Sequence, residues 1–212
     1  MSRISSRLAG LSLSLLLIPA LGAAAQNLRE RGDSLLQAGR FDDARALGLA
    51  GLQANPNDVD ASILVCEGLL GLGRSDDAIN YASKAWERRN DPRLAELLGQ
   101  AYFGLGRNAT ALSWLRFYLA ALPEGPQAAS ALYMSGEIYL RLGRYGHADM
   151  AISTALFLSP GNATWWSRLA WAQEKAGDFR QALASYESAL GIDPRLDDAV
   201  IGRARVLARL RG

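Results

Sequence analysis

The sequence has 212 residues, with 23 Lys or Arg, 21 Asp or Glu and one histidine, and its formal net charge is +2. Arg3 and Arg7 lie in the first 25 residues, which contain no acid, so the rest of the chain carries equal numbers of acidic and basic residues. This balance argues against a nucleic-acid-binding protein, because that class needs a basic face to neutralise phosphates. The single cysteine, Cys66, excludes an intramolecular disulfide scaffold.

Residues 1–25 predict a secretory signal peptide. Arg3 and Arg7 form the positive segment, Leu8 to Leu21 is largely apolar, and Ala23-Ala24-Ala25 fits the small-residue cleavage site. The apolar run is shorter than the ~20 residues that span a bilayer as a helix, and no cysteine follows it to carry a lipid. We therefore expect export to the periplasm or cell envelope and no membrane span after cleavage. The alternative is an uncleaved N-terminal anchor, which would also place the remaining chain across the membrane.

Five glycines recur along the chain at intervals of 34, 33, 37 and 34 residues. They are Gly39, Gly73, Gly106, Gly143 and Gly177. An alanine follows each glycine five residues later, at Ala44, Ala78, Ala111, Ala148 and Ala182. A period near 34 is typical of stacked helical hairpins, in which each unit contacts only its neighbours.

The stretch from Ala163 to Pro194 shows how one unit is built. Its first half places apolar residues at helical spacing, and Gly177 suits the left-handed conformation that ends a helix. Asp178 suits the capping position of a second apolar helix, which Pro194 closes because proline cannot continue it. The pattern predicts a hairpin whose two apolar faces meet.

This unit resembles the tetratricopeptide repeat (TPR) family. Its residues in the signature slots of that family are Trp166, Leu169, Ala182, Tyr186, Ala189 and Pro194, with Ala170 for the usual Gly and Gln173 for the usual Tyr. The preceding unit matches through Gly136, Tyr139, Gly143, Tyr145, Ala148, Ala155 and Pro160. The resemblance implies an all-α solenoid that binds other proteins, and it identifies no partner.

We expect five helix-turn-helix repeats and one C-terminal capping helix. The repeats cover residues 26–58, 59–91, 92–128, 129–162 and 163–196, and the capping helix covers 197–210. In that helix Val200, Arg203, Ala204 and Leu207 repeat the core pattern. Its other face should be polar, a role that suits Arg203, Arg205, Arg209 and Arg211.

The third repeat departs from the others. It is three residues longer because of the turn Pro123-Glu124-Gly125-Pro126, and Tyr118 stands in a slot that holds Gly or Ala in the other repeats. The two departures predict one adjustment, with a wider gap or a different angle between the third and fourth hairpins.

No catalytic constellation, metal-ligand spacing or phosphate-binding loop is present in the sequence, so we expect a non-enzymatic protein without cofactor or metal. His147 is expected to be solvent-exposed, and Cys66 to be a small buried core residue rather than a redox group. Asn108 and Asn162 fit glycosylation triplets but are better placed as helix caps.

The resemblance implies a binding groove lined by the first helix of each repeat. Residues at i, i+4 and i+7 of these helices give a middle row that is largely acidic and a third row that is apolar. The predicted partner-binding residues are Glu67, Leu70, Gln100, Phe103, Tyr133, Glu137, Leu140 and Trp171, and the aromatic anchors among them are Phe103, Tyr133 and Trp171. Asp33 and Leu36 continue the two rows into the first repeat. Arg29 alone does not make the family's clamp for a C-terminal carboxylate, because Asp33, Leu64 and Leu97 occupy key slots.

Such a surface suits a segment with basic and apolar side chains, so we expect an adaptor or assembly factor that binds a protein partner. Two structural alternatives remain open for it: the apolar row packs neighbouring first helices, and the acids are simply solvated. A different role is a structural subunit of an envelope complex that docks through its outer helices and C-terminal cap. An envelope-processing enzyme is a more distant alternative.

Overall fold

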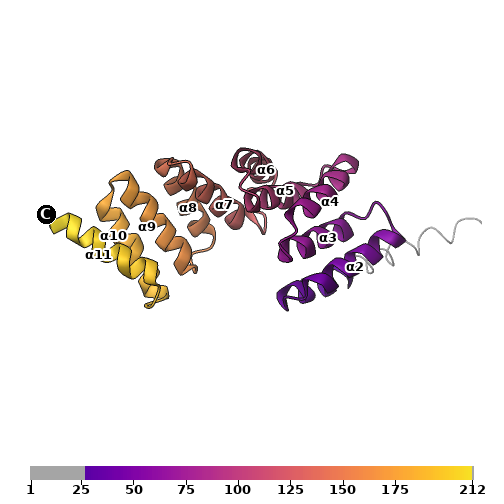
Figure 1. Cartoon of the computed structure of the whole chain (residues 1–212), viewed down its shortest axis with the longest axis horizontal. Helices are drawn as coiled ribbons and strands as arrows, with labels where there is room; N and C mark the ends of the chain where they lie inside the picture. The colour runs from indigo at the N-terminus through magenta and orange to yellow at the C-terminus, as the bar shows by residue number, and fades with distance from the viewer. Residues whose placement is uncertain (1–26, 212) are drawn as a thin grey trace, which may run out of the picture. The chain divides into compact units, whose positions relative to one another are not determined.

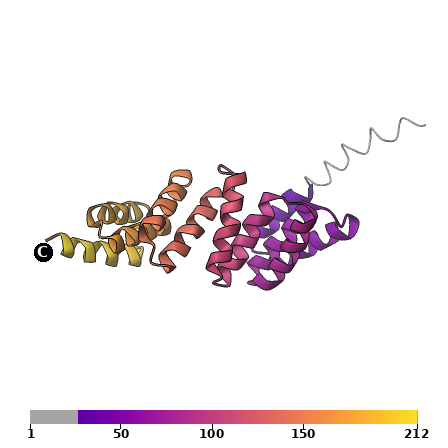
Figure 2. The same cartoon turned by 90° about the horizontal axis from the view of Figure 1, so that it is seen from above.

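A computed structural model describes residues 27–211, and within this range every regular element is a helix (Figure 1, Figure 2). The all-α class is therefore confirmed; the predicted signal peptide, residues 1–25, lies outside the described residues. In chain order the helices are residues 27–37, α2 (Phe41–Ala54), α3 (Val59–Gly71), α4 (Ser75–Arg88), α5 (Pro92–Gly104), α6 (Asn108–Ala121), α7 (Ala128–Arg141), α8 (Tyr145–Leu158), α9 (Ala163–Ala176), α10 (Phe179–Ile192) and α11 (Asp197–Arg211).

The helices form two compact units that divide between Arg89 and Asn90. The described part of unit 1 contains two hairpins, made by the helix at residues 27–37 with α2 and by α3 with α4. Unit 2 contains three hairpins, α5–α6, α7–α8 and α9–α10, followed by α11 (Figure 1).

The predicted turn glycines all adopt the left-handed conformation that ends a helix. Gly143, for example, has a φ of 68°, and its N–H donates to the carbonyl of Leu140 while the N–H of Arg144 donates to that of Tyr139. These bonds satisfy carbonyls that the end of α7 would otherwise leave unpaired. The periodic glycines therefore fix the turn inside each hairpin.

The predicted helix caps are only partly correct. Asn162 caps α9 by accepting a hydrogen bond from the N–H of Trp165 at 3.1 Å. Asp178 makes no side-chain cap bond, and Asn108 is the first residue of α6 rather than its cap. Both predictions were wrong because the left-handed glycine turn already directs the chain into the second helix, so a side-chain cap is not required there.

Small residues let the two helices of each hairpin approach closely. The periodic alanines are at most 1 % exposed, and Cys66, in the corresponding slot of a first helix, is fully buried. The Cys66 thiol contacts the carbonyl of Ala78 at 3.8 Å, and burial raises its pKa to about 12. A buried thiol with this pKa is not a reactive nucleophile at neutral pH, which agrees with its predicted role in the core.

Tyr118 and the long turn after α6 form one structural feature. The Tyr118 side chain is buried, and its hydroxyl accepts a hydrogen bond from the N–H of Gln127 at 3.1 Å. A side chain at Gly125 would collide with the same hydroxyl. Helices α6 and α7 contact each other across this turn; a wider gap or a different angle between the third and fourth hairpins stays a prediction.

The core prediction for α11 was wrong. Its buried residues are Ala199, Gly202 and Val206, which face α10, whereas the predicted core residue Val200 is 46 % exposed. Arg203 and Ala204 are also exposed, and Leu207 is half-buried. The α9 residues that correspond to Ala204 and Leu207 are Ala170 and Gln173, which are buried and contact α10. The described residues contain no helix that covers these positions on α11.

Close helix contact makes the first prediction. A side chain at Gly68 would meet the backbone carbonyl of Phe41 and the backbone N–H of Arg45 within 2.8 Å. We therefore expect Gly68→Ala to reduce the free energy of unfolding by about 1–3 kcal/mol, as overpacking does. Denaturant unfolding followed by circular dichroism measures this.

The control for that experiment is Gly146→Ala. Gly146 lies in α8 with no atom within 4 Å of its added Cβ, so alanine should stabilise the helix by about 0.5–1 kcal/mol. Equal midpoints for the two variants would contradict the proposed contact at Gly68.

Candidate partner-binding surface

In unit 1 Arg29 forms ion pairs with both acids of the predicted middle row, Asp33 and Glu67. Arg29 places a guanidinium nitrogen 3.4 Å from a Glu67 carboxylate oxygen, and its Nε lies 3.2 Å from a carboxylate oxygen of Asp33. Leu70, from the apolar row, is half-buried on α3. The carboxylates therefore join the first helices of neighbouring hairpins.

In unit 2 the same arrangement links α7 to α9. Arg168 donates two hydrogen bonds to Glu137, at 2.7 and 2.9 Å, and the Glu137 side chain is only 13 % exposed. These bonds raise the pKa of the Arg168 guanidinium. Gln100, in the equivalent row on α5, is exposed. The acidic row is thus largely ion-paired, rather than free or simply solvated.

The predicted aromatic anchors lie in a series of ring contacts on α5, α7 and α9. The Arg141 guanidinium lies 4.2 Å from the ring centroid of Phe103. The Tyr133 ring stacks on Trp165, with centroids 4.6 Å apart and planes 9° apart. The rings of Phe103, Tyr133 and Trp165 are half-buried, so each keeps some surface exposed to solvent.

Trp171 contacts cations and a second aromatic ring. The guanidinium of Arg168 and the ammonium of Lys175 lie 4.9 and 5.6 Å from its ring centroid, within cation–π range. Tyr145 meets the same ring edge-on at 6.2 Å. Leu140 is buried in the core beneath these rings and contributes no open surface, so for this member of the apolar row helix packing is the correct reading.

A hollow of about 190 Å³ lies beside Trp171. Its lining residues come from α9, α10 and α11 and are Ser167, Arg168, Trp171, Tyr186, Asp198, Ile201 and Arg205. Arg205 donates to Glu174 at 2.7 Å, and the Tyr186 hydroxyl donates to the same carboxylate at 3.0 Å. The bond from Arg205 lowers the pKa of Glu174, with a further lowering from Tyr186.

Sequence reasoning found Trp171 in this hollow but missed Arg168, Arg205, Asp198 and Ile201. One signal was available: Glu137 and Arg168 are 31 residues apart, and Glu174 and Arg205 have the same separation. A recurring Glu–Arg interval slightly below the repeat period places the two side chains on adjacent first helices, which is where the structure pairs them.

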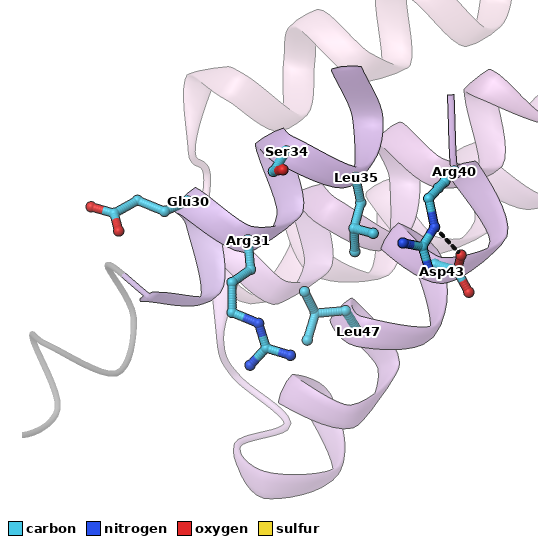
Figure 3. Close-up of a pocket in the computed structure, with 7 residues that line it drawn as sticks. All are labelled: Glu30, Arg31, Ser34, Leu35, Arg40, Asp43 and Leu47. Carbon is cyan, nitrogen blue, oxygen red and sulfur yellow. Dashed lines mark hydrogen bonds and ion pairs between the residues drawn. The ribbon is translucent and has the colours of Figure 1, made fainter. Parts of the chain in front are cut away.

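A larger hollow, of about 590 Å³, lies in unit 1 between the helix at residues 27–37 and α2 (Figure 3). Figure 3 shows Leu35 and Leu47 pointing toward each other, the Arg40–Asp43 ion pair at one side, and Glu30 directed away. Arg40 and Asp43 in this lining form an exposed ion pair of 2.8 Å, and the hollow is a depression on the surface of the first hairpin.

The described residues hold no cluster of histidine, cysteine or carboxylate side chains that could bind a metal ion. Among residues 27–211, no helix combines the length and the apolar character that a membrane crossing requires.

Tetratricopeptide repeat models match residues 35–101, 92–116, 133–197 and 167–211. The chain belongs to the tetratricopeptide repeat family. Proteins with this fold are protein-interaction modules.

Solved structures resemble the chain along most of its length. A thermophilic TPR protein from Thermus thermophilus is 26 % identical, with a TM-score of 0.65, covering 87 % of this chain and 99 % of that one. The MamA protein is 23 % identical, with a TM-score of 0.63, covering 82 % and 94 %. A comparison with curated proteins returns no match.

The Glu174–Arg205 pair generates a pH prediction. Because the folded-state pKa of Glu174 is lowered, its stabilising effect is present above the ordinary carboxyl pKa and is lost as the pH falls through the folded value. Arg205→Ala should therefore reduce the free energy of unfolding at pH 7 by at most about 1 kcal/mol, since the arginine is half exposed. The difference should vanish in acid.

Arg203→Ala is the matched control, because Arg203 on the same helix reaches Glu187 only at 3.4 Å and both partners are well exposed. Its effect at pH 7 should be smaller than that of Arg205→Ala. An Arg205→Ala effect that persists unchanged at pH 2 would contradict the ionic assignment. Chemical unfolding at several pH values provides the measurement.

Proposed function

We propose that the protein is a non-enzymatic adaptor or assembly factor of the cell envelope that binds a segment of a partner protein. The array belongs to a family of interaction modules, which supports the general class of function. The envelope location rests on the sequence of residues 1–25 alone.

The observation that carries the proposal is the row of half-buried rings on the first helices of unit 2, namely Phe103, Tyr133, Trp165 and Trp171. Large aromatic side chains that retain exposed faces dominate the energetics of protein interfaces. The neighbouring carboxylates are already bound by arginines. A partner would therefore gain most from apolar side chains that cover the rings, and its basic groups would have to compete with internal arginines.

A second candidate function is that of a structural subunit that docks through outer helices. It is favoured by two exposed apolar side chains on α8, Met150 at 71 % and Phe157 at 86 % exposure. Between Asp149 and the end of α8 there is no charged residue to interrupt this face. Substitutions on α8 distinguish it from the first candidate.

The main proposal is tested by affinity capture from cell envelopes, followed by calorimetry with the protein that co-purifies. Combining Phe103→Ala, Tyr133→Ala and Trp171→Ala should weaken binding at least about tenfold, equal to about 1.4 kcal/mol. Phe157→Ala is the matched control and should bind like the unaltered chain. If only Phe157→Ala weakens binding, the outer-helix role replaces the proposed one.

Export has a separate test. We expect the protein isolated from fractionated cells to begin at Gln26, because cleavage follows Ala25. N-terminal sequencing and intact-mass measurement of the full-length product give the answer. A product that retains Arg3 and Arg7 in the membrane fraction would indicate the uncleaved anchor, and one retained in the cytoplasm would contradict export.

A further inference from the structure

Helix α11 has a face that no described helix covers, although the corresponding face is covered in the preceding hairpins. Val200, Arg203, Ala204 and Leu207 form this face, which is called the α11 open face below. In α9 the residues 34 positions earlier include Ala170 and Gln173, which are buried against α10. The repeat register therefore shows what kind of element fits the open face, namely a second helix.

The sequence places apolar side chains where a terminal cap would be polar. Repeat arrays normally end in a polar outer face, which prevents exposure of the last apolar surface. Here Arg205 turns toward Glu174 on α9, and Arg203 turns toward Glu187 on α10. These two arginines therefore do not shield the face, and Val200 and Leu207 remain partly exposed beside the small Ala204.

The geometry of the other hairpins indicates how an added helix would approach. In each of them the contact between helices is made by a small residue, such as Ala148 or Ala182 of the second helix, which is fully buried. Ala204 offers the same close approach on α11.

The charge around the open face indicates the character of the added helix. Arg209 and Arg211 lie exposed in the last turn of α11, whereas Arg203 is already paired with Glu187. An amphipathic helix with acidic residues beside its apolar stripe would complement these arginines. At this end of α11 a helix with basic flanks would meet like charges, whereas the acids Asp197 and Asp198 lie in the first turn.

A second copy of the chain fits less well. The helix at residues 27–37 carries Asn27, Arg31 and Ser34 at positions where α3 buries Ala61, Val65 and Gly68. This end of unit 1 is therefore polar, and a copy that presented it would bring Arg31 toward the arginines of α11. The observations thus favour a helix from a different protein.

We propose that the α11 open face binds an amphipathic helix with an acidic flank, supplied by another protein, in the position of a further second helix. This rests on the proposed role as an interaction module but uses a surface separate from the rings of α5, α7 and α9. The two can therefore fail independently.

The test uses the full chain and a peptide with the sequence of residues 178–193, which carries three acids and one arginine and already packs, as α10, against a first helix of this protein. Ala184→Lys and Ser188→Glu in the peptide, joined by a lactam bridge, hold it helical, because a free peptide of this length is marginally helical. Both positions are exposed in α10. Fluorescence anisotropy measures the binding of the labelled peptide.

We expect saturable binding that Ala204→Glu in the chain weakens at least about tenfold, while Ala184→Glu, at an exposed position of α10, leaves it unchanged. Peptide substitutions Glu187→Lys and Asp193→Lys should also weaken binding. Circular dichroism of both chain variants confirms that they are folded.

Three results would overturn the proposal. The first is no binding up to a peptide concentration of about 1 mM, which is the weak end of measurable affinity. The second is equal binding to the Ala204→Glu chain. The third is sedimentation in which the unaltered chain is a dimer and the Ala204→Glu chain is a monomer. The open face would then be a contact between copies. A further comparison uses the variant with Phe103→Ala, Tyr133→Ala and Trp171→Ala. If this variant binds the peptide as the unaltered chain does, the α11 open face is separate from the surface proposed above.

Discussion

The structure depends on the close contact between the two helices of each hairpin. Small residues of the two helices meet at Cys66 and Ala78, at Gly136 and Ala148, and at Ala170 and Ala182, and all of them are buried. Close approach brings many atoms into van der Waals contact and removes apolar surface from water, and neither gain is possible if either residue is large. Because each hairpin buries only its own inner faces, its outer surfaces must be covered by the next hairpin. The array and its exposed ends follow from this one contact.

The charged residues of the first helices serve this stacking. Arg29, Arg168 and Arg205 each reach a carboxylate on a neighbouring first helix, at Glu67, Glu137 and Glu174 respectively. Exposed ion pairs of this type contribute little to stability, but they fix which side chains face the partner surface. They occupy the carboxylates, and the paired Arg168 also lies over the ring of Trp171. The guanidinium over Phe103 is that of Arg141, which belongs to none of these three pairs. What remains open on this surface is mainly aromatic.

The parts of the fold that depend on local sequence could be predicted. A glycine such as Gly143 adopts a left-handed turn because of its own backbone, and a small residue such as Ala148 packs in the same slot of every repeat. The pairing of Glu137 with Arg168 could not be read in the same way, since it depends on how one hairpin stacks on the next. Helix α11 carries the sequence pattern of a first helix, but the described residues include no second helix that packs against it. Val200 therefore stands at a core position of the pattern and is exposed in the structure.

Tyr118, Gly125 and Gln127 give the third repeat a property that the others lack. The hydroxyl of the buried Tyr118 accepts a hydrogen bond from the N–H of Gln127, and Gly125 leaves the space that this hydroxyl needs. Repeat proteins commonly diversify by duplicating or exchanging whole units, because neighbouring units share one type of contact. Here a crossover between Tyr118 and Gln127 would separate parts that fit only each other. The segment from 118 to 127 should therefore be inherited as a block, and it is the natural boundary to respect when chimaeras of this array are built.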